Sequence, residues 1–211
     1  LSARLMPRYC AGHRNPEPEH EMSAHDTALL VIDVQESFRQ RAYWREAEAA
    51  PFFDRVQALI DGAKAASIPI AQIFHVDPDG PFSTASGHVK LLSPVQITPD
   101  AVFEKPRHSA LVGNCPAPVE PVQSRVIVSG IRTEQCCETT TRHASDLGYE
   151  VDYVTEATLT FAMTDASGRT WSADEIRART ELVLAGRFAT ITSVEQALAR
   201  AMDGRGEREA A

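Results

Sequence analysis

The 211 residues carry 29 acidic and 21 basic side chains, which gives a formal net charge of −8 at pH 7. An acidic surface disfavours nucleic acid and anionic membranes as partners, and 43% hydrophobic with 24% charged residues excludes a disordered chain. The apolar runs are far shorter than the roughly 18–20 residues of a membrane span, and the first twenty residues lack the apolar stretch of a secretion signal.

The length suits a single domain. Residues 1–22 are polar and unpatterned, so we expect a disordered arm, a tag remnant or an overlong reading frame there, with Met22 as a natural start. Residues 23–211 are expected to form the domain.

The cysteines show no C-x-x-C pair of the metal-binding kind, and four in a chain of this length do not suggest a disulfide framework. We expect reduced thiols in a cytoplasmic protein. One of them is then free to be chemically active. The four are Cys10, Cys115, Cys136 and Cys137.

Short apolar segments recur along the chain and predict strands. The first is apolar at nearly every position, which is typical of a strand buried on both faces. The segments are residues 27–33, 68–76, 101–103, 125–130, 150–154 and 188–192.

Segments with helical patterns lie between several of these strands. An apolar stripe over residues 53–63 follows Pro51, which suits a first helical position. A second helix is predicted over residues 133–147, with Gly148 as its stop. Ser172 with Glu175, and Ser193 with Gln196, are typical of capping boxes that open two further helices.

Alternating strands and helices predict an α/β fold: a doubly wound, mostly parallel six-stranded sheet with helices on both faces, Rossmann-like in arrangement. Two connections rich in proline, residues 77–99 and 113–124, are predicted to lack long regular structure. Long irregular loops in compact domains are usually functional or disordered.

Ligands of open parallel sheets bind at the carboxyl ends of the strands. Asp33 ends the first strand, Lys105 follows the third, and Cys136 lies in the first turn of the helix after the fourth. Each has an ordinary structural alternative: a turn or helix cap, a solvated surface charge, and a packed thiol. Together at one sheet edge they predict a reactive site.

The chemistry of these groups is consistent with a nucleophile and its base. Few thiols are ionised at neutral pH, but a helix start and a nearby Lys105 ammonium both favour the thiolate of Cys136. Asp33 disfavours the thiolate while it is charged, but it can accept the thiol proton directly.

Four segments around these residues carry a further signal. They are Gly-Ile-Arg-Thr-Glu-Gln-Cys-Cys-Glu-Thr-Thr at 130–140, Asp-Val-Gln-Glu-Ser-Phe at 33–38, Lys-Pro-Arg-His-Ser-Ala at 105–110, and residues 142–149. Together they resemble the motifs of a known family, the isochorismatase-like cysteine hydrolases, over about residues 28–198. The chain is similar to the amidohydrolase branch, which includes relatives of N-carbamoylsarcosine amidase and nicotinamidase.

The resemblance implies an isochorismatase-like fold and a catalytic triad of Asp33, Lys105 and Cys136. It also implies a cis peptide bond before Arg132 and an oxyanion hole formed by the backbone N–H groups of Arg132 and Cys136. Cys137 stands where the family usually has a small apolar residue, so we expect it to pack in the core.

The implied reaction is hydrolysis of a C–N bond in a small amide or carbamoyl compound through a Cys136 thioester, with no cofactor. A homodimer or higher homo-oligomer is expected, because relatives commonly self-associate. Leu111 replaces a common Phe, so the substrate is poorly constrained. Candidate substrate-binding residues are Gln35, Phe38, Arg107, His108 and Arg132.

Nicotinamidases of this superfamily hold a metal through an Asp-x-His pair and a further His. Here His75 and Asp77 stand in the reverse order, with His88 further along, so we predict no metal. Three other functions stay open. They are an isochorismatase-type vinyl-ether hydrolase, which needs the Asp but no thiol nucleophile; a non-catalytic binding protein on the same fold; and a redox pair of Cys136 and Cys137.

Overall fold

A computed structural model describes residues 26–112 and 124–209. The expectations about residues 1–22 and about nearly all of 113–124 therefore concern parts of the chain outside it. None of the helices in the described residues is long and apolar enough to cross a membrane.

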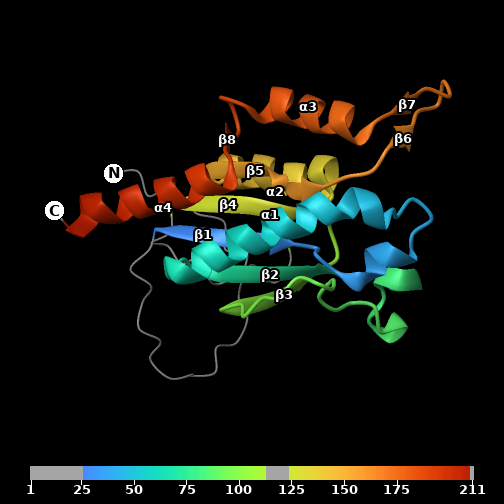
Figure 1. Ribbon diagram of the computed structural model, residues 1–211, viewed down its shortest axis with the longest axis horizontal. Helices are drawn as coiled ribbons and strands as arrows, with labels where there is room; N and C mark the ends of the chain where they lie inside the picture. The colour runs from blue at the N-terminus through green and yellow to red at the C-terminus, as the bar shows by residue number, and fades with distance from the viewer. Residues whose placement is uncertain (1–25, 113–123, 210–211) are drawn as a thin grey trace, which may run out of the picture.

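The centre of the molecule is a six-stranded parallel sheet with the strand order β3-β2-β1-β4-β5-β8 (Figure 1). This confirms the predicted α/β class. The strands are β1 (Thr27–Ile32), β2 (Ile70–His75), β3 (Ala101–Lys105), β4 (Arg125–Ile131), β5 (Glu150–Leu159) and β8 (Thr190–Ile191).

The direction in which the chain adds strands reverses between β1 and β4. These two strands pair side by side, with Thr27 opposite Arg125 at one end and Ile32 opposite Gly130 at the other. From β1 the chain builds outward through β2 to β3, and from β4 it builds the other way through β5 to β8. The carboxyl ends of β1 and β4 therefore meet at the switch point, where open parallel sheets bind their ligands.

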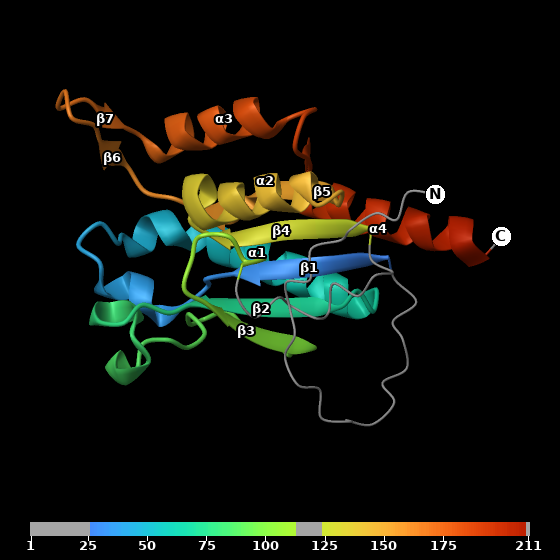
Figure 2. The ribbon, with the colours of Figure 1, turned by 180° about the vertical axis from the view of Figure 1, so that it is seen from behind.

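Two helices cover each face of the sheet (Figures 1 and 2). α1 (Glu46–Ala65) and α4 (Val194–Glu209) enclose one apolar core, and α2 (Glu138–Asp146) with α3 (Ala173–Leu184) encloses the other. The β1 residues alternate between the two cores, Leu29 and Val31 in one and Leu30 and Ile32 in the other. This explains why β1 is apolar at every position.

The helices begin where the sequence pattern predicts, except for the helix that contains Pro51. Both predicted capping boxes form: Ser172 Oγ accepts from Glu175 N–H, and Ser193 Oγ from Gln196 N–H. The prediction that Pro51 opens its helix is wrong, because α1 begins at Glu46. Strong helix formers precede the proline and extend the helix by more than one turn before it, although Pro51 has no N–H to donate.

Strand lengths differ from the sequence prediction at the far edge of the sheet. β5 continues through polar residues to Leu159, and its register with β4 shifts between Val128 and Gly130 of β4. β8 is only Thr190–Ile191. A hairpin of β6 (Met163–Thr164) and β7 (Thr170–Trp171), which extends beyond the sheet in Figure 1, was not predicted. Its strands of two residues are too short for a periodic signal.

The connection over residues 77–99 has no long regular element, as expected. It contains only the single turns η2 (Gly80–Phe82) and η3 (Thr84–Ser86). A further 3-10 turn, η1 (Glu36–Gln40), follows β1. These loops all leave strand ends at the switch-point edge, so they can form walls around a site there.

Candidate active site

The three reactive residues predicted at the sheet edge lie together. Lys105 Nζ donates to Asp33 Oδ2 at 2.8 Å and to Cys136 Sγ at 3.4 Å. It also donates to the Arg107 carbonyl at 3.0 Å and lies 3.4 Å from His75 Nδ1. The ammonium is thus the centre of a compact group made from the ends of β1, β3 and β4.

The backbone around Asp33 is held in an unusual conformation. Asp33 has a φ of 54°, a left-handed conformation that costs a non-glycine residue about 1–3 kcal/mol. Its N–H donates to the Ile73 carbonyl at 2.8 Å, which ties the residue to β2. Its Oδ1 is buried and has no hydrogen-bond partner within the described chain. One carboxylate oxygen is therefore left able to accept a proton.

Cys136 lies in a single π-helical turn, η4 (Thr133–Cys137), that precedes α2. Such turns are rare and often occur at functional sites. The Cys136 side chain is 6% exposed and its Sγ lies 3.6 Å from His108 Nδ1, whereas Cys137 is completely buried in the core beneath α2. The peptide bond between Ile131 and Arg132 is cis.

Burial dominates the ionisation of the carboxyl group. It raises the pKa of Asp33 above the ordinary 3.8, although the neighbouring Lys105 charge opposes the rise. Burial also opposes the charged form of Lys105, but the charges of Asp33 and Cys136 outweigh it and leave the pKa of Lys105 raised. Each charge favours the ionised form of the other, but for Asp33 the effect of burial is larger.

The Cys136 thiol behaves differently from the sequence expectation. We expected the helix start and Lys105 to favour the thiolate. Burial, and then the Asp33 charge, raise the pKa of Cys136 far above its ordinary value, and Lys105 only partly compensates. The resting thiol is therefore protonated, and its proton has to leave when a substrate is bound.

A small pocket opens over these groups, with a volume of about 180 Å³. At about 30 Å³ per water this equals roughly six waters, well below the roughly 300–1,000 Å³ of pockets for drug-sized ligands. The pocket suits a small molecule. It is lined by Asp33, Phe38, Arg41, Tyr43, His75, Asp77, Phe82, His108, Gln135 and Cys136.

Only some of the predicted substrate-binding residues line this pocket. Phe38 and His108 do. Gln35 is buried and fastens the end of β2: its amide donates to the His75 carbonyl at 3.1 Å, and its oxygen accepts from the His75 N–H at 2.8 Å. Arg107 is exposed and donates to the Pro106 carbonyl. Arg132 is buried in an ion pair with Glu134 at 3.0 Å.

Four further residues line the pocket that no sequence pattern indicated: Arg41, Tyr43, Phe82 and Gln135. Arg41 and Tyr43 follow η1 in an irregular loop, and Phe82 belongs to η2. Residues in such loops have no periodic signal that would show which way they face. Leu111 packs among the buried side chains around Cys136 and Cys137, not in the pocket.

The residues considered for a metal do not form a ligand set. His75 Nε2 and Asp77 Oδ1 lie 3.0 Å apart and pair with each other. Within residues 26–112 and 124–209, no group of three or more His, Cys, Asp or Glu side chains is arranged to hold a metal ion.

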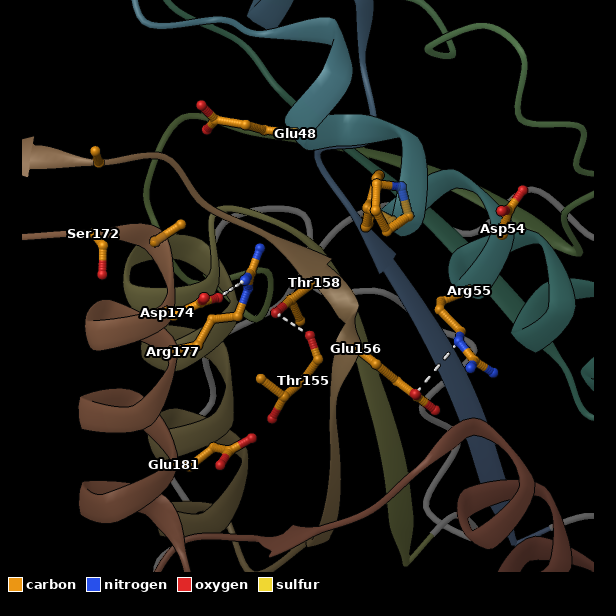
Figure 3. A pocket seen from close by; sticks show the side chains of 14 residues that line it. Glu48, Asp54, Arg55, Thr155, Glu156, Thr158, Ser172, Asp174, Arg177 and Glu181 are labelled. Carbon is orange, nitrogen blue, oxygen red and sulfur yellow. Dashed lines mark hydrogen bonds and ion pairs between the residues drawn. The ribbon is translucent and has the colours of Figure 1, made fainter.

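A larger groove of about 970 Å³ lies between α1, the end of β5 and α3 (Figure 3). Its charged residues are carboxylates and two arginines, Arg55 and Arg177, and the latter pairs with Asp174. Among the residues that the structure describes, no cysteine, histidine or lysine lines this groove. Its lining offers no strong nucleophile, so the smaller pocket is the candidate active site.

Comparisons with known proteins agree with this fold. The sequence profile of a family described as "Isochorismatase domain" matches residues 27–196. Nicotinamidase 3 of Arabidopsis thaliana is 31% identical over 156 residues, which cover 64% of this chain and 73% of the plant protein. An isochorismatase-like structure from Burkholderia xenovorans LB400 is 27% identical with a TM-score of 0.76, covering 85% of this chain and 89% of that one. A cysteine hydrolase from Pseudomonas syringae pv. phaseolicola 1448A has a TM-score of 0.76 at 19% identity, covering 90% and 99% of the two chains.

Proposed function

The chain belongs to the isochorismatase family of hydrolases, and we propose that it hydrolyses a C–N bond in a small amide or carbamoyl compound through a Cys136 thioester. One observation carries the proposal. A buried ammonium, Lys105, contacts both the Asp33 carboxylate and the Cys136 sulfur beside a pocket that fits a small molecule. The likeness to a nicotinamidase supports the bond type.

The first half of the reaction forms the thioester. The Cys136 sulfur attacks the carbonyl carbon while its proton passes to Asp33, whose Oδ1 has no other partner in the described chain. The oxyanion accepts hydrogen bonds from the backbone N–H groups of Arg132 and Cys136. The C–N bond then breaks, Asp33 returns the proton to the leaving nitrogen, and ammonia or an amine departs.

The second half releases the acid. Asp33 takes a proton from a water molecule as its oxygen attacks the thioester carbonyl. The C–S bond then breaks, Asp33 returns the proton to the Cys136 sulfur, and the carboxylic acid and the free thiol are released. Lys105 stays charged throughout. It stabilises the negative charge that moves between the carboxylate and the sulfur, both of which accept a hydrogen bond from it.

A screen for ammonia release tests the proposal. Wild type and Cys136→Ala are compared over small amides, ureas and carbamoyl compounds, and we expect turnover that the variant loses without loss of fold. Trapping of an acyl adduct on Cys136, seen as a mass increase of the intact protein, supports the thioester directly. Near-normal turnover by Cys136→Ala would refute it.

The same screen separates the rival functions. An isochorismatase-type vinyl-ether hydrolase releases pyruvate from isochorismate and keeps this activity in Cys136→Ala, because it needs no thiol. A non-catalytic binding protein gives no turnover with either substrate class. A redox pair with Cys137 is disfavoured by geometry, because only Cys136 of the two faces the pocket.

Self-association also belongs to this proposal. α3 and the β6–β7 hairpin carry large exposed apolar side chains: Met163, Trp171 and, at 79% exposed, Leu182. Large apolar side chains left exposed on a projecting part of a protein are candidates for a contact with another chain. Light scattering at micromolar concentration should give a mass of at least two chains, and Leu182→Glu should reduce it.

A further inference from the structure

Arg41 has a guanidinium without a partner at the pocket. Most arginines of this protein that the structure describes are paired with carboxylates, including Arg39, Arg125 and Arg142. Arg41 has no ion pair and no side-chain hydrogen bond within residues 26–112 and 124–209, and it is the arginine among the residues that line the pocket. Its five donors are therefore available to a bound molecule.

The position of Arg41 is supported by the residues around it. Its guanidinium carbon lies 5.8 Å from the centre of the Tyr43 ring, within the range of a cation–π contact. The Tyr43 ring has packing partners of its own. Its centre lies 5.2 Å from the centre of the Phe161 ring and 5.0 Å from the guanidinium carbon of the buried Arg132. The loop after η1 thus presents a positive group beside a fixed aromatic surface.

The acidic side chains that line the pocket already have partners. Asp33 forms an ion pair with Lys105, and Asp77 Oδ1 lies 3.0 Å from His75 Nε2. Within the described residues, Arg41 forms no ion pair with either carboxylate. Arg41 is exposed to solvent, so its guanidinium can bind a negative group of a molecule in the pocket without first breaking another ion pair.

We propose that the substrate carries a carboxylate, and that Arg41 binds this group while the amide or carbamoyl carbon lies at Cys136. The inference rests on the proposed C–N hydrolysis and names its substrate class: short ω-amides or N-carbamoyl derivatives of small carboxylic acids. The pocket of about 180 Å³ limits the chain between the two groups to a few carbon atoms. The rings of Phe38 and Phe82, which meet edge to face at 5.0 Å, provide an apolar wall for that chain.

Matched substrate pairs test the proposal. Succinamate is compared with succinamide, and N-carbamoylglycine with N-carbamoylglycinamide, so that each pair differs in one carboxylate. Wild type should prefer the charged member. Arg41→Met should lower kcat/KM for the charged member about 10- to 100-fold more than for the neutral one, as expected for a lost hydrogen-bonded charge pair.

Two further variants sharpen the result. Arg41→Lys keeps the charge but not the paired donors of a guanidinium, so its selectivity should fall between those of wild type and Arg41→Met. Arg187→Met makes the same change at an exposed arginine outside the pocket, whose guanidinium carbon lies 5.5 Å from the centre of the Phe188 ring, and it should leave the ratio unchanged. Equal loss on both members of a pair in Arg41→Met would overturn the proposal, as would wild type showing no preference.

A binding measurement separates this inference from the reaction itself. Calorimetry with Cys136→Ala should show that succinamate binds at least tenfold more tightly than succinamide, and that Cys136→Ala/Arg41→Met loses the difference. If no pair is hydrolysed but this preference exists, the proposed reaction fails and the carboxylate site stands. If turnover occurs without any preference in rate or binding, the reaction stands and the role of Arg41 is refuted.

Discussion

Lys105 and Asp33 form an ion pair 2.8 Å apart, with side chains that are 1% and 0% exposed. Removing two charges from water costs several kcal/mol per ion, and their attraction repays this only while both are present. The pair that organises the site is therefore also a point at which the fold is vulnerable.

Replacing one member of this pair should destabilise the protein strongly. Lys105→Met should lower the free energy of unfolding by about 3–5 kcal/mol at pH 7, because it leaves a buried carboxylate without compensation. The double variant Asp33→Asn/Lys105→Met should lose less than the sum of the two single variants, as measured by urea denaturation. Additive losses would show that the two charges are not coupled.

The loss in Lys105→Met should also depend on pH. Burial already raises the pKa of Asp33, and removal of Lys105 takes away the main opposing influence. Above the ordinary pKa of 3.8 the unfolded chain releases a proton that the folded chain keeps, so stability falls as pH rises. We expect a smaller penalty at pH 4 than at pH 7, and a constant penalty would contradict this.

Labelling of Cys136 should be slow at neutral pH. Because its pKa is raised, the rate with iodoacetamide should still increase at pH 10, where an ordinary thiol has levelled off. Measurement in a background with Cys10, Cys115 and Cys137 all replaced by Ala assigns the signal to one thiol, because the chain has four cysteines. Asp33→Asn should accelerate labelling, because the carboxylate charge raises the pKa of the thiol. Slower labelling in that variant would mean that Asp33 already withdraws the proton in the free enzyme.

Cys137 should matter for stability and not for turnover. It is fully buried among the apolar side chains beneath α2. Cys137→Ser places a hydroxyl there and should cost about 1–3 kcal/mol, with kcat/KM within about twofold of wild type by the ammonia assay. Loss of activity in a folded Cys137→Ser protein would assign it a role in the reaction.

Gly130 should tolerate no side chain. Its φ is 124°, and a Cβ there would lie 1.9 Å from the Ile32 carbonyl oxygen of the neighbouring strand. We expect Gly130→Ala to prevent folding or to cost more than about 3 kcal/mol. Gly168→Ala is the control: its φ is 87° but the space around it is open, so only backbone strain of about 1–2 kcal/mol is expected. Circular dichroism and denaturation distinguish the two.

The fold and the reactive group at the sheet edge could be predicted because both rest on local patterns. Strands buried on both faces leave unbroken apolar runs, and in a parallel sheet the residue after each run lies at one known edge. This placed Asp33, Lys105 and Cys136 together. The sequence pattern could not show how deeply these side chains are buried. The expected lowering of the pKa of Cys136 is therefore wrong for the free protein, in which burial raises that pKa.

The walls of the pocket were less accessible to sequence reasoning. Arg41 and Tyr43 lie in a loop, where the direction of a side chain depends on distant partners such as Phe161. The substrate-binding role expected for Gln35 and Arg132 depends on the same kind of information. The structure shows each occupied by protein partners, Gln35 by the backbone of His75 and Arg132 by Glu134.

The clamp that Gln35 makes on the backbone of His75 has a consequence for how this enzyme can diversify. It anchors the loop after β1 to the end of β2 through main-chain atoms, and these do not depend on the identity of the neighbouring side chains. The positions beyond the clamp, Arg41 and Phe82 among them, can then be exchanged in evolution without moving the ends of β1 and β2. New substrates can be acquired by mutation of the loops while the sheet keeps the chemistry constant.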